Sequence, residues 1–277
     1  MGEERDTSEP HGAAGAASAA YRERASRLPG AVLWTKATGS SARPVLPDGC
    51  TDLIWSAGRL LVAGPDTGPH LPETVPADSG PDSVAGRGGA PAVGLRFAPG
   101  QGPSVFGVPA HELRNLRVPL EDLWPAGRVR EAAERVAASG APGRVLEETA
   151  AGRLREAADL AGLADWADRA DRSGLSGRSA RTAAIAAALA RGRPVADVAL
   201  SAGLSARQLH RHSLDAFGYG PKTLARVLRF VRALDLARSG MPYAEVAARA
   251  GFADQAHLAR EVKSLAGAPM GVLLGPG

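Results

Sequence analysis

The sequence has little cysteine, few aromatic side chains and no long apolar run. Cys50 is the only cysteine among 277 residues, which excludes an internal disulfide and any zinc site built from several cysteines. Aromatic residues make up only 4% of the chain, and no stretch approaches the roughly 20 consecutive apolar residues that a membrane-spanning helix needs. The acidic N-terminal residues do not resemble a secretory leader. These absences favour a cytoplasmic protein in a reducing compartment.

Charge is unevenly distributed along the chain. The net charge is +4, but between Gly174 and the C-terminus 14 lysine and arginine residues stand against 6 aspartate and glutamate residues. This balance of +8 leaves −4 for the rest of the chain. Such asymmetry is expected when only one part of a protein meets phosphate groups. At roughly 100 to 200 residues per domain, we expect about two domains.

The first half of the chain is punctuated by proline and glycine. Residues 1–20 lack apolar periodicity, which predicts a disordered lead-in. Four short apolar runs bounded by turn-forming residues predict strands, namely Ala31–Trp34, Asp52–Trp55, Leu60–Ala63 and Ala92–Phe97. We therefore expect a β-rich sensory or dimerisation domain at residues 21–118, with long loops near Pro65–Pro91.

After Pro119 the pattern becomes helical, which predicts a helical connector at residues 119–173. Alanine, arginine, glutamate and leucine recur at helical spacing in Leu120–Trp124, Arg128–Ala138 and Gly143–Ala167. Gly140–Gly143 is expected to interrupt these helices, and Asp171–Gly174 to form a hinge. Residues 174–277 are then predicted to form an all-α domain, so the fold class is α+β.

One motif occurs twice in this last domain, about 48 residues apart, at residues 195–217 and 243–265. Each copy has a short helix with valine and alanine at packing positions, a glycine, and a second helix. In both copies, a proline follows 18 positions after that glycine. Gly203 and Gly251 suit a tight turn, where a residue without Cβ is least strained. The two copies are therefore predicted to be helix-turn-helix units.

The second helix of each unit, at residues 205–217 and 254–265, is predicted to be a recognition helix. Ser205 and Asp254 occupy the N-cap positions, where a side-chain oxygen accepts from free amides. The expected packing residues are Leu209, Ser213, Ala216 and Phe217 in the first helix and Leu258, Val262 and Leu265 in the second. The expected DNA-binding residues are Ser205, Arg207, Gln208, His210, Arg211, Asp254, Gln255, His257, Arg260 and Lys263, with Ala206 and Ala256 beside them. Arginine suits guanine, glutamine suits adenine, and lysine or histidine suits phosphate. An ordinary polar surface is the alternative for a single helix, but the repeat with matching caps favours recognition.

A long helix, Pro221–Ser239, is predicted between the two units. Proline at its start and Gly240 at its end fit the usual terminal preferences. Its 19 residues would span about 28 Å, near the roughly 34 Å that separates successive major-groove faces of B-DNA. An alanine-rich helix, Ser179–Ala190, is expected to support the first unit. A rigid spacer of this length would let both recognition helices reach adjacent grooves.

Several short stretches of this domain form a further pattern: Val198–Gly203, Leu209–Arg211, Gly218–Pro221, Leu228–Phe230, Leu236–Arg238, Val246–Phe252, His257–Arg260 and Gly267–Pro269. Together they resemble the DNA-binding domain of AraC-type transcription regulators over Ser176–Leu274. The resemblance implies seven helices and two recognition helices in successive major grooves. It places base contacts on Arg207, His210, Arg211, Gln255, His257 and Arg260. His212, Ser213 and Val262 depart from the pattern, where larger apolar or aromatic residues are common, so thinner packing is expected there.

Residues 44–66 and Gly94–Gly100 are similar to the sensory half of one actinobacterial-type branch of this family. The resemblance implies effector binding or dimerisation, without naming a ligand. Cys50 is a candidate redox or electrophile sensor, with a small buried hydrophobic role as the favoured alternative.

Other candidate sites in the first half have weak patterns. The spacing of Asp48, Asp52, Asp66 and His70 matches no metal-ligand motif and favours turns. His111 precedes Glu112 without the second histidine of a metalloprotease. The tryptophans Trp34, Trp55 and Trp124 would line an apolar pocket or, as the favoured alternative, pack in the core.

The leading hypothesis is a sequence-specific, effector-responsive transcription regulator with no catalytic residues, cofactor or metal. Its expected partner is double-stranded promoter or operator DNA. A small-molecule effector, a second copy of the chain and RNA polymerase are further candidates, and a membrane is not. One alternative is a DNA-binding module fused to a small enzyme, such as a DNA-alkylation-repair-like domain that uses Cys50. Such relatives carry a four-cysteine zinc site, which one cysteine cannot form. Another alternative is a helical array that binds only proteins.

Overall fold

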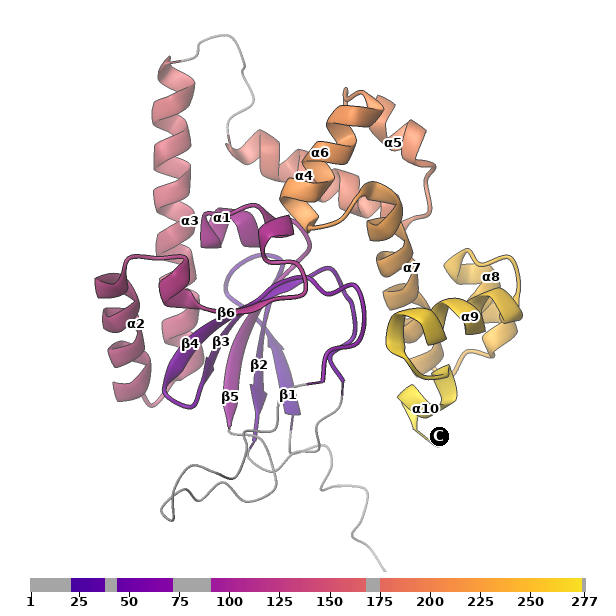
Figure 1. Cartoon of the computed structure of the whole chain (residues 1–277), viewed down its shortest axis with the longest axis horizontal. Helices are drawn as coiled ribbons and strands as arrows, with labels where there is room; N and C mark the ends of the chain where they lie inside the picture. Colours follow the sequence, from indigo (N-terminus) through magenta and orange to yellow (C-terminus); the bar gives the residue numbers. More distant parts are fainter. Residues whose placement is uncertain (1–20, 38–43, 72–90, 168–174, 276–277) are drawn as a thin grey trace, which may run out of the picture.

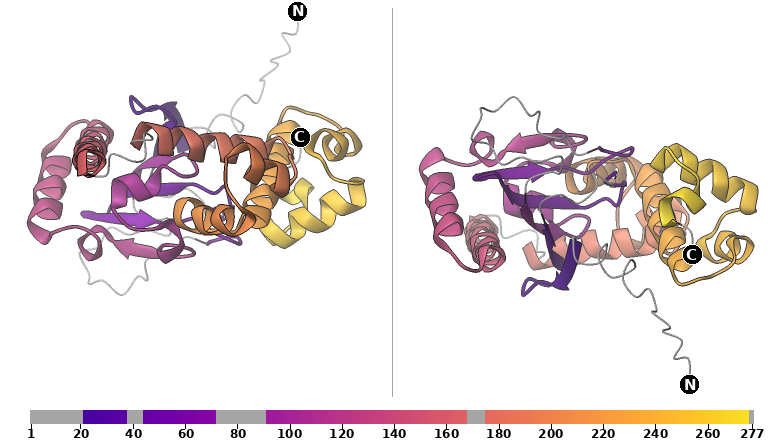
Figure 2. Two further views of the ribbon diagram at one scale, coloured as in Figure 1. Left: turned by 90° about the horizontal axis from the view of Figure 1, so that it is seen from above. Right: turned by 90° about the horizontal axis from the view of Figure 1, so that it is seen from below.

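The computed structural model describes residues 21–37, 44–71, 91–167 and 175–275 (Figure 1). A sheet with helices forms an N-terminal body, and an all-helical part lies beside it (Figures 1 and 2). The predicted α+β class is confirmed. The expected lead-in at 1–20, the hinge at Asp171–Gly174 and residues 72–90 of the expected long loops lie outside the described residues.

The N-terminal body contains one antiparallel sheet, in which the described residues form six strands. The strands are β1 (Tyr21–Ala25), β2 (Ala31–Lys36), β3 (Thr51–Ser56), β4 (Arg59–Ala63), β5 (Ala92–Phe97) and β6 (Arg117–Pro119), in the spatial order β1-β2-β5-β3-β4-β6. All four predicted strands are present. The apolar pattern does not reveal β1, which is charged and exposed along its length, or β6, which has only three residues.

The register of the central strands separates an apolar face from a polar one. Leu33, Leu95 and Leu53 pair across β2, β5 and β3, and all three are buried. Because side chains alternate along a strand, the neighbouring Asp52 and Arg96 lie on the opposite face, paired with each other. The apolar face packs against α1 (Gly102–Phe106), α2 (Ala126–Ala138) and α3 (Pro142–Ala167) (Figure 2).

The described helices of the expected connector, 119–173, share the core of the sheet. Val136 of α2 and Leu146 of α3 lie in the same apolar cluster as Leu53. Leu120–Trp124 forms only a 3-10 helix, Leu120–Asp122, and a second 3-10 helix spans Ala110–Glu112. Helix α3 begins at Pro142, so Gly143 lies within the helix rather than in the expected break. A Cβ at Gly143 would overlap the Leu33 side chain, so this glycine permits close packing of helix on sheet.

The C-terminal part is built from seven helices in the described residues, as the family resemblance implies. They are α4 (Leu175–Ala190), α5 (Val195–Ser201), α6 (Ala206–Phe217), α7 (Pro221–Arg238), α8 (Tyr243–Ala250), α9 (Gln255–Ala266) and α10 (Met270–Leu274). One apolar cluster joins α4, α5 and α6 to the first half of α7, and a second joins its later half to α8, α9 and α10. Helix α7 is therefore the element that the two clusters share.

Candidate nucleic-acid interface

Helices α5 and α6 form the first helix-turn-helix unit, here called the first reader. Gly203 in its turn has φ +67°, a left-handed conformation that glycine adopts without a Cβ clash. Ser205 Oγ accepts from the Gln208 amide at 3.2 Å, while Gln208 Oε1 accepts from the Ser205 amide at 2.8 Å. This reciprocal capping box satisfies two amides at the start of α6. The predicted cap and turn are therefore present.

The packing face of α6 contains the residues expected there. Leu209, Ser213 and Phe217 are buried, and Ala216 is partly buried. Ser213 Oγ has no hydrogen-bond partner within the described part of the chain. A buried hydroxyl without a partner costs free energy, so the departure from the family pattern at Ser213 is the weak point of this face.

The opposite face of α6 carries cations that are free to bind an external partner. Arg207, His210 and Arg211 are exposed, as are Ala206 and Gln208. Among the described residues, neither Arg207 nor Arg211 takes part in an ion pair or side-chain hydrogen bond, and their four-residue spacing places them on one helical face. The His210 ring lies over Gly220, where an added Cβ would be 2.9 Å from Cε1. The face therefore offers two guanidinium groups for phosphate or base contacts.

Helices α8 and α9 form the second unit, called the second reader. Gly251 has φ +85°, and Asp254 Oδ1 accepts from the His257 amide at 2.6 Å. The predicted packing residues Leu258, Val262 and Leu265 are all buried. Val262 is fully enclosed, so its departure from the family pattern leaves it well packed. The second reader repeats the turn and cap of the first, without the reciprocal capping box.

The outer face of α9 presents Gln255, Arg260 and Lys263, which are exposed together with Ala256. His257 is only partly exposed, which differs from its expected outward position. Its Nδ1 accepts from the Ala253 amide at 3.3 Å, and its ring meets Phe252 edge-on with centroids 5.4 Å apart. The His257 side chain is therefore turned back onto the loop before α9. Residue spacing alone does not predict this hydrogen bond between His257 and Ala253.

Helix α7 connects the two readers with 18 residues, and Ser239 is its C-cap rather than its last residue. At 1.5 Å per residue it spans about 27 Å. The Arg226 guanidinium donates to Glu261 at 2.5 Å and to Ser264 Oγ at 2.7 Å, which ties α9 to α7. The second reader and α7 are therefore linked by ionic as well as apolar contacts.

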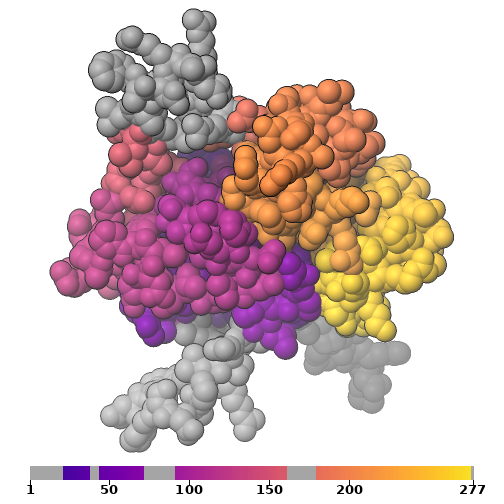
Figure 3. Space-filling view, turned by 45° about the horizontal axis from the view of Figure 1, so that its top comes forward, coloured from indigo at the N-terminus to yellow at the C-terminus, as the bar shows by residue number. Residues whose placement is uncertain are grey.

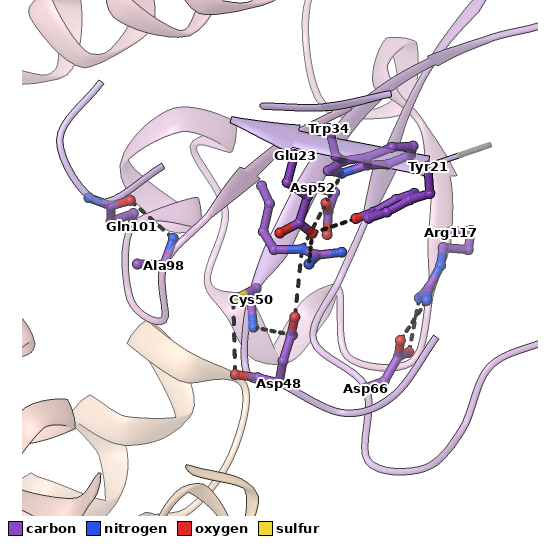
Figure 4. Close-up of polar contacts among 11 residues, drawn as sticks. Tyr21, Glu23, Trp34, Asp48, Cys50, Asp52, Asp66, Ala98, Gln101 and Arg117 are labelled. Atoms are coloured by element: carbon purple, nitrogen blue, oxygen red, sulfur yellow. Dashed lines mark hydrogen bonds and ion pairs between the residues drawn. The ribbon is translucent and has the colours of Figure 1, made fainter. Parts of the chain in front are cut away.

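Some of the candidates of the first half form a polar cluster on the sheet face opposite the helices (Figure 4). They are Asp48, Cys50, Asp52 and Trp34. Arg96 Nε lies 3.3 Å from Asp52 Oδ1 and 3.6 Å from Asp48 Oδ2, and the Trp34 indole donates to Asp52 at 2.6 Å. Arg96 is not predicted as part of a site from the sequence. Its position between Leu95 and Phe97 in β5 does place it on this face, because side chains alternate along a strand. Burial raises the pKa of the Cys50 thiol well above its usual value, and Asp48 and Asp52 act in the same direction. The thiol is therefore held protonated, which disfavours reactivity.

The other candidates do not join this cluster. Asp66 instead pairs with Arg117 (Figure 4), and His70 bridges to Val45. The described residues contain no group of three or more histidine, cysteine or acidic side chains able to hold a metal.

The remaining candidates of the first half do not form one site. Trp124 is in the core with its indole donating to the Phe106 carbonyl, and Trp55 packs against the same core. Trp34 lies on the other face, so the three tryptophans share no pocket. His111 lies in a 3-10 helix and faces Asp215 of α6 at 3.5 Å.

Two capped helix-turn-helix units on one shared helix define a DNA-binding protein. Residues 198–274 match the model of a helix-turn-helix domain, and residues 31–119 match that of a domain of unknown function, DUF6597. The C-terminal part of the chain is therefore a helix-turn-helix domain of the kind that binds DNA. No curated protein matches the sequence. In the described part of the chain, no helix is long and apolar enough to cross a bilayer.

Solved structures of ToxT from Vibrio cholerae are similar to this chain at low identity. One is 9% identical, covers 93% of this chain and 100% of ToxT, and has a TM-score of 0.42. A ligand-free lysine-to-alanine variant is 12% identical over 89% of this chain and 97% of ToxT, with a TM-score of 0.41. A third, with an unsaturated fatty acid bound, is 11% identical over 84% and 89%, with a TM-score of 0.38. These values are too low to carry a ligand or mechanism from ToxT to this chain.

Proposed function

We propose that the chain reads two short blocks of promoter DNA, one with α6 and the other with α9. The observation that carries this proposal is that two capped helices with exposed, unpaired cationic or amide side chains are mounted on one shared helix. The proposed DNA-binding residues are Ser205, Arg207, Gln208, His210 and Arg211 in the first reader, and Asp254, Gln255, His257, Arg260 and Lys263 in the second. The chain would act on promoters in the cytoplasm.

The two sets of side chains suit different roles. Arg207, Arg211 and Arg260 can each donate two hydrogen bonds to guanine, and Gln255 can pair with adenine. Lys263 suits a phosphate as a point charge. These differences support unequal target sequences for the two readers.

The capping residues support this recognition from the start of each helix. Ser205 and Asp254 direct their side-chain oxygens at main-chain amides, and Gln208 and His257 use one polar atom each in the same local networks. Gln208 still has its amide NH₂ group available as a donor. We propose that these four residues hold the start of each recognition helix against the DNA.

Residues 21–118 would respond to a small-molecule effector or mediate dimerisation, with residues 119–173 as the connector and 174–277 as the DNA-binding domain. Support comes from the separate domain match over residues 31–119 and from direct contacts with α6 and the turn that follows it. RNA polymerase would be a further partner of the DNA-bound protein.

Binding of the purified full-length chain to duplexes enriched from a random library tests this function. We expect an enriched site whose affinity exceeds that of a shuffled duplex by about 10³-fold or more, with affinity falling steeply as salt rises. The shuffled duplex at each salt concentration is the matched control. Binding that shows no sequence preference, or that is unaffected by Arg211→Ala and Arg260→Ala, would overturn the proposed base recognition, and the absence of duplex binding would favour the protein-only alternative.

A further inference from the structure

The turn that joins α6 to α7, Gly218–Gly220, is held by the N-terminal body from two sides. Tyr219 is 1% exposed, and its hydroxyl donates to the main-chain carbonyl of Asp66 at 2.5 Å. Arg114 donates to the Gly218 carbonyl at 3.3 Å. A buried tyrosine needs a partner for its hydroxyl, and here that partner belongs to the other part of the molecule. The turn therefore depends on the N-terminal body for its position.

The acceptor of the Tyr219 hydroxyl is itself rigidly supported. The Asp66 carboxylate, on a residue only 8% exposed, receives two hydrogen bonds from Arg117, at 2.9 Å and 2.5 Å. The Asn115 amide donates to the Pro65 carbonyl at 3.0 Å, and Asn115 Oδ1 accepts from the Thr67 amide at 2.7 Å. Paired arginine-carboxylate contacts have a fixed geometry. The loop around Asp66 is therefore tied to β6 and can position Tyr219.

Contacts on either side of the turn extend this attachment to the first reader and α7. His111 Nδ1 lies 3.5 Å from Asp215 Oδ1 on α6. A Cβ added to Gly100 would lie 2.9 Å from Phe217, and one added to Gly49 would lie 3.6 Å from Leu224 Cδ1 on α7. The surfaces of the N-terminal body and of α6 and α7 are accordingly continuous in Figure 3.

The N-terminal body also reaches the second reader. Leu46 packs against the apolar cluster of α8, α9 and α10. A Cβ on Gly267, directly after α9, would lie 3.4 Å from the Pro69 ring. One segment of the chain, residues 44–71, thus contacts the second reader, α7 and the turn that joins α7 to the first reader.

The first reader is joined to α7 by this turn and by the apolar cluster that α6 shares with the first half of α7. The two readers have separate apolar cores, and Gly218, at φ +78°, adopts a conformation that few other residues tolerate. Helix α6 is about 18 Å long, so a tilt of about 10° at the turn would move its far end by about 3 Å, close to one base-pair step. Small changes at the turn therefore alter where α6 meets the DNA.

We infer that Tyr219, Asp66, Arg117 and Arg114 are positioning residues that fix the spacing between the two DNA blocks. The inference rests on the proposed function, because it requires that both readers bind the same duplex. The N-terminal body holds the α6-α7 turn, and the turn sets the separation of the recognition helices. A change in the 44–71 segment would then be transmitted to DNA as a change in preferred spacing.

Spacing variants of the selected site test this inference with the full-length protein. In these duplexes the gap between the two blocks is lengthened or shortened by one and two base pairs. For each base pair added to or removed from the gap, we expect the wild-type protein to lose about tenfold or more in affinity, comparable to the effect of a mismatched base pair. Tyr219→Phe removes the hydroxyl and keeps the ring. In this variant we expect the affinity lost per base-pair change in the gap to be only about threefold, in line with one lost hydrogen bond.

A second variant and two controls keep the test decisive. Arg114 is exposed, so Arg114→Ala leaves the core intact and should flatten the spacing profile in the same direction. Tyr243→Phe and Arg130→Ala are matched controls, because these exposed side chains have no polar partner among the described residues, and both should keep the wild-type profile. A profile as steep as wild type in both Tyr219→Phe and Arg114→Ala would overturn the inference. Failure of the proposed function differs, since the wild-type protein would then select no two-block site.

Discussion

The two readers share one motif but are attached to the molecule differently. The first has polar contacts with the N-terminal body, through Asp215 and the adjoining Gly218–Gly220 turn. The second meets that body through apolar contacts of Leu46 and Pro69 and is tied to α7 by Arg226. Their outer faces also differ, with Arg207 and Arg211 on one and Gln255 with Arg260 and Lys263 on the other. Duplication of a motif therefore has not produced two equivalent sites. Hydrogen bonds tie the N-terminal body to the turn after the first reader, whereas ionic contacts tie the second reader to α7.

The largest expected effect comes from removing one core phenylalanine from each reader. Phe217→Ala and Phe252→Ala should each lower the free energy of unfolding by about 3–5 kcal/mol, because both rings are buried. Since Phe217 also abuts Gly100, its loss should raise hydrogen exchange in the N-terminal body. The effect of Phe252→Ala should be largest in α8, α9 and the later half of α7, which share its apolar cluster. Urea unfolding and hydrogen exchange measure these outcomes.

The control for this pair is Leu200→Ala, since Leu200 is 82% exposed and its removal should change stability by about 0.5 kcal/mol or less. If hydrogen exchange in the N-terminal body were unchanged by Phe217→Ala, the first reader would be no more strongly coupled to that body than the second reader is.

Base recognition should give the next largest effect. Arg211→Ala and Arg260→Ala should each weaken binding to the selected site by about 1–3 kcal/mol, the range for a lost bidentate base contact. Titration of labelled duplex measures the loss, with Arg130→Ala as the matched arginine control. A loss no larger than that of the control would remove the affected arginine from the interface.

The N-caps offer a smaller comparison between the readers. Ser205→Ala and Asp254→Ala should each cost about 1 kcal/mol, because each leaves an amide at a helix start without its partner. Gln208→Ala should add a cost in the first reader alone, since only that reader has the reciprocal bond. Thermal unfolding checks these values, and Asp254→Asn, which keeps an acceptor, should retain most of the stability. Equal stability of Ser205→Ala and wild type would contradict the observed capping box.

The smallest expected difference is a pH dependence located in the first reader. Burial lowers the pKa of His212, with the nearby Arg181 charge acting in the same direction and Asp215 opposing both. The unfolded chain therefore binds a proton more readily, so this contribution to stability is full above a pH of about 6.5 and declines as the pH falls below it. His212→Gln should reduce the dependence of unfolding free energy on pH between 7.5 and 5.5. An unchanged slope would exclude His212 as its source.

Local features of the fold could be predicted from the sequence, while distant pairings could not. Gly203, Ser205 and Asp254 act within a few residues of themselves, so spacing alone predicts the turns and caps. The contact between Tyr219 and Asp66 joins residues 153 positions apart, and no periodicity encodes it. Strand β1 escapes prediction because its pairing with β2, rather than an apolar face, makes it a strand.

The most direct test of the account is site selection from random DNA by the wild-type, Arg211→Ala and Arg260→Ala chains in parallel. The wild-type protein should select two different blocks whose centres lie about 10 base pairs apart, one helical turn. Arg211→Ala should lose sequence preference in one block only, and Arg260→Ala in the other only. Loss of preference in the same block for both variants, or equally across the whole site, would contradict the claim that two unequal readers act from one chain.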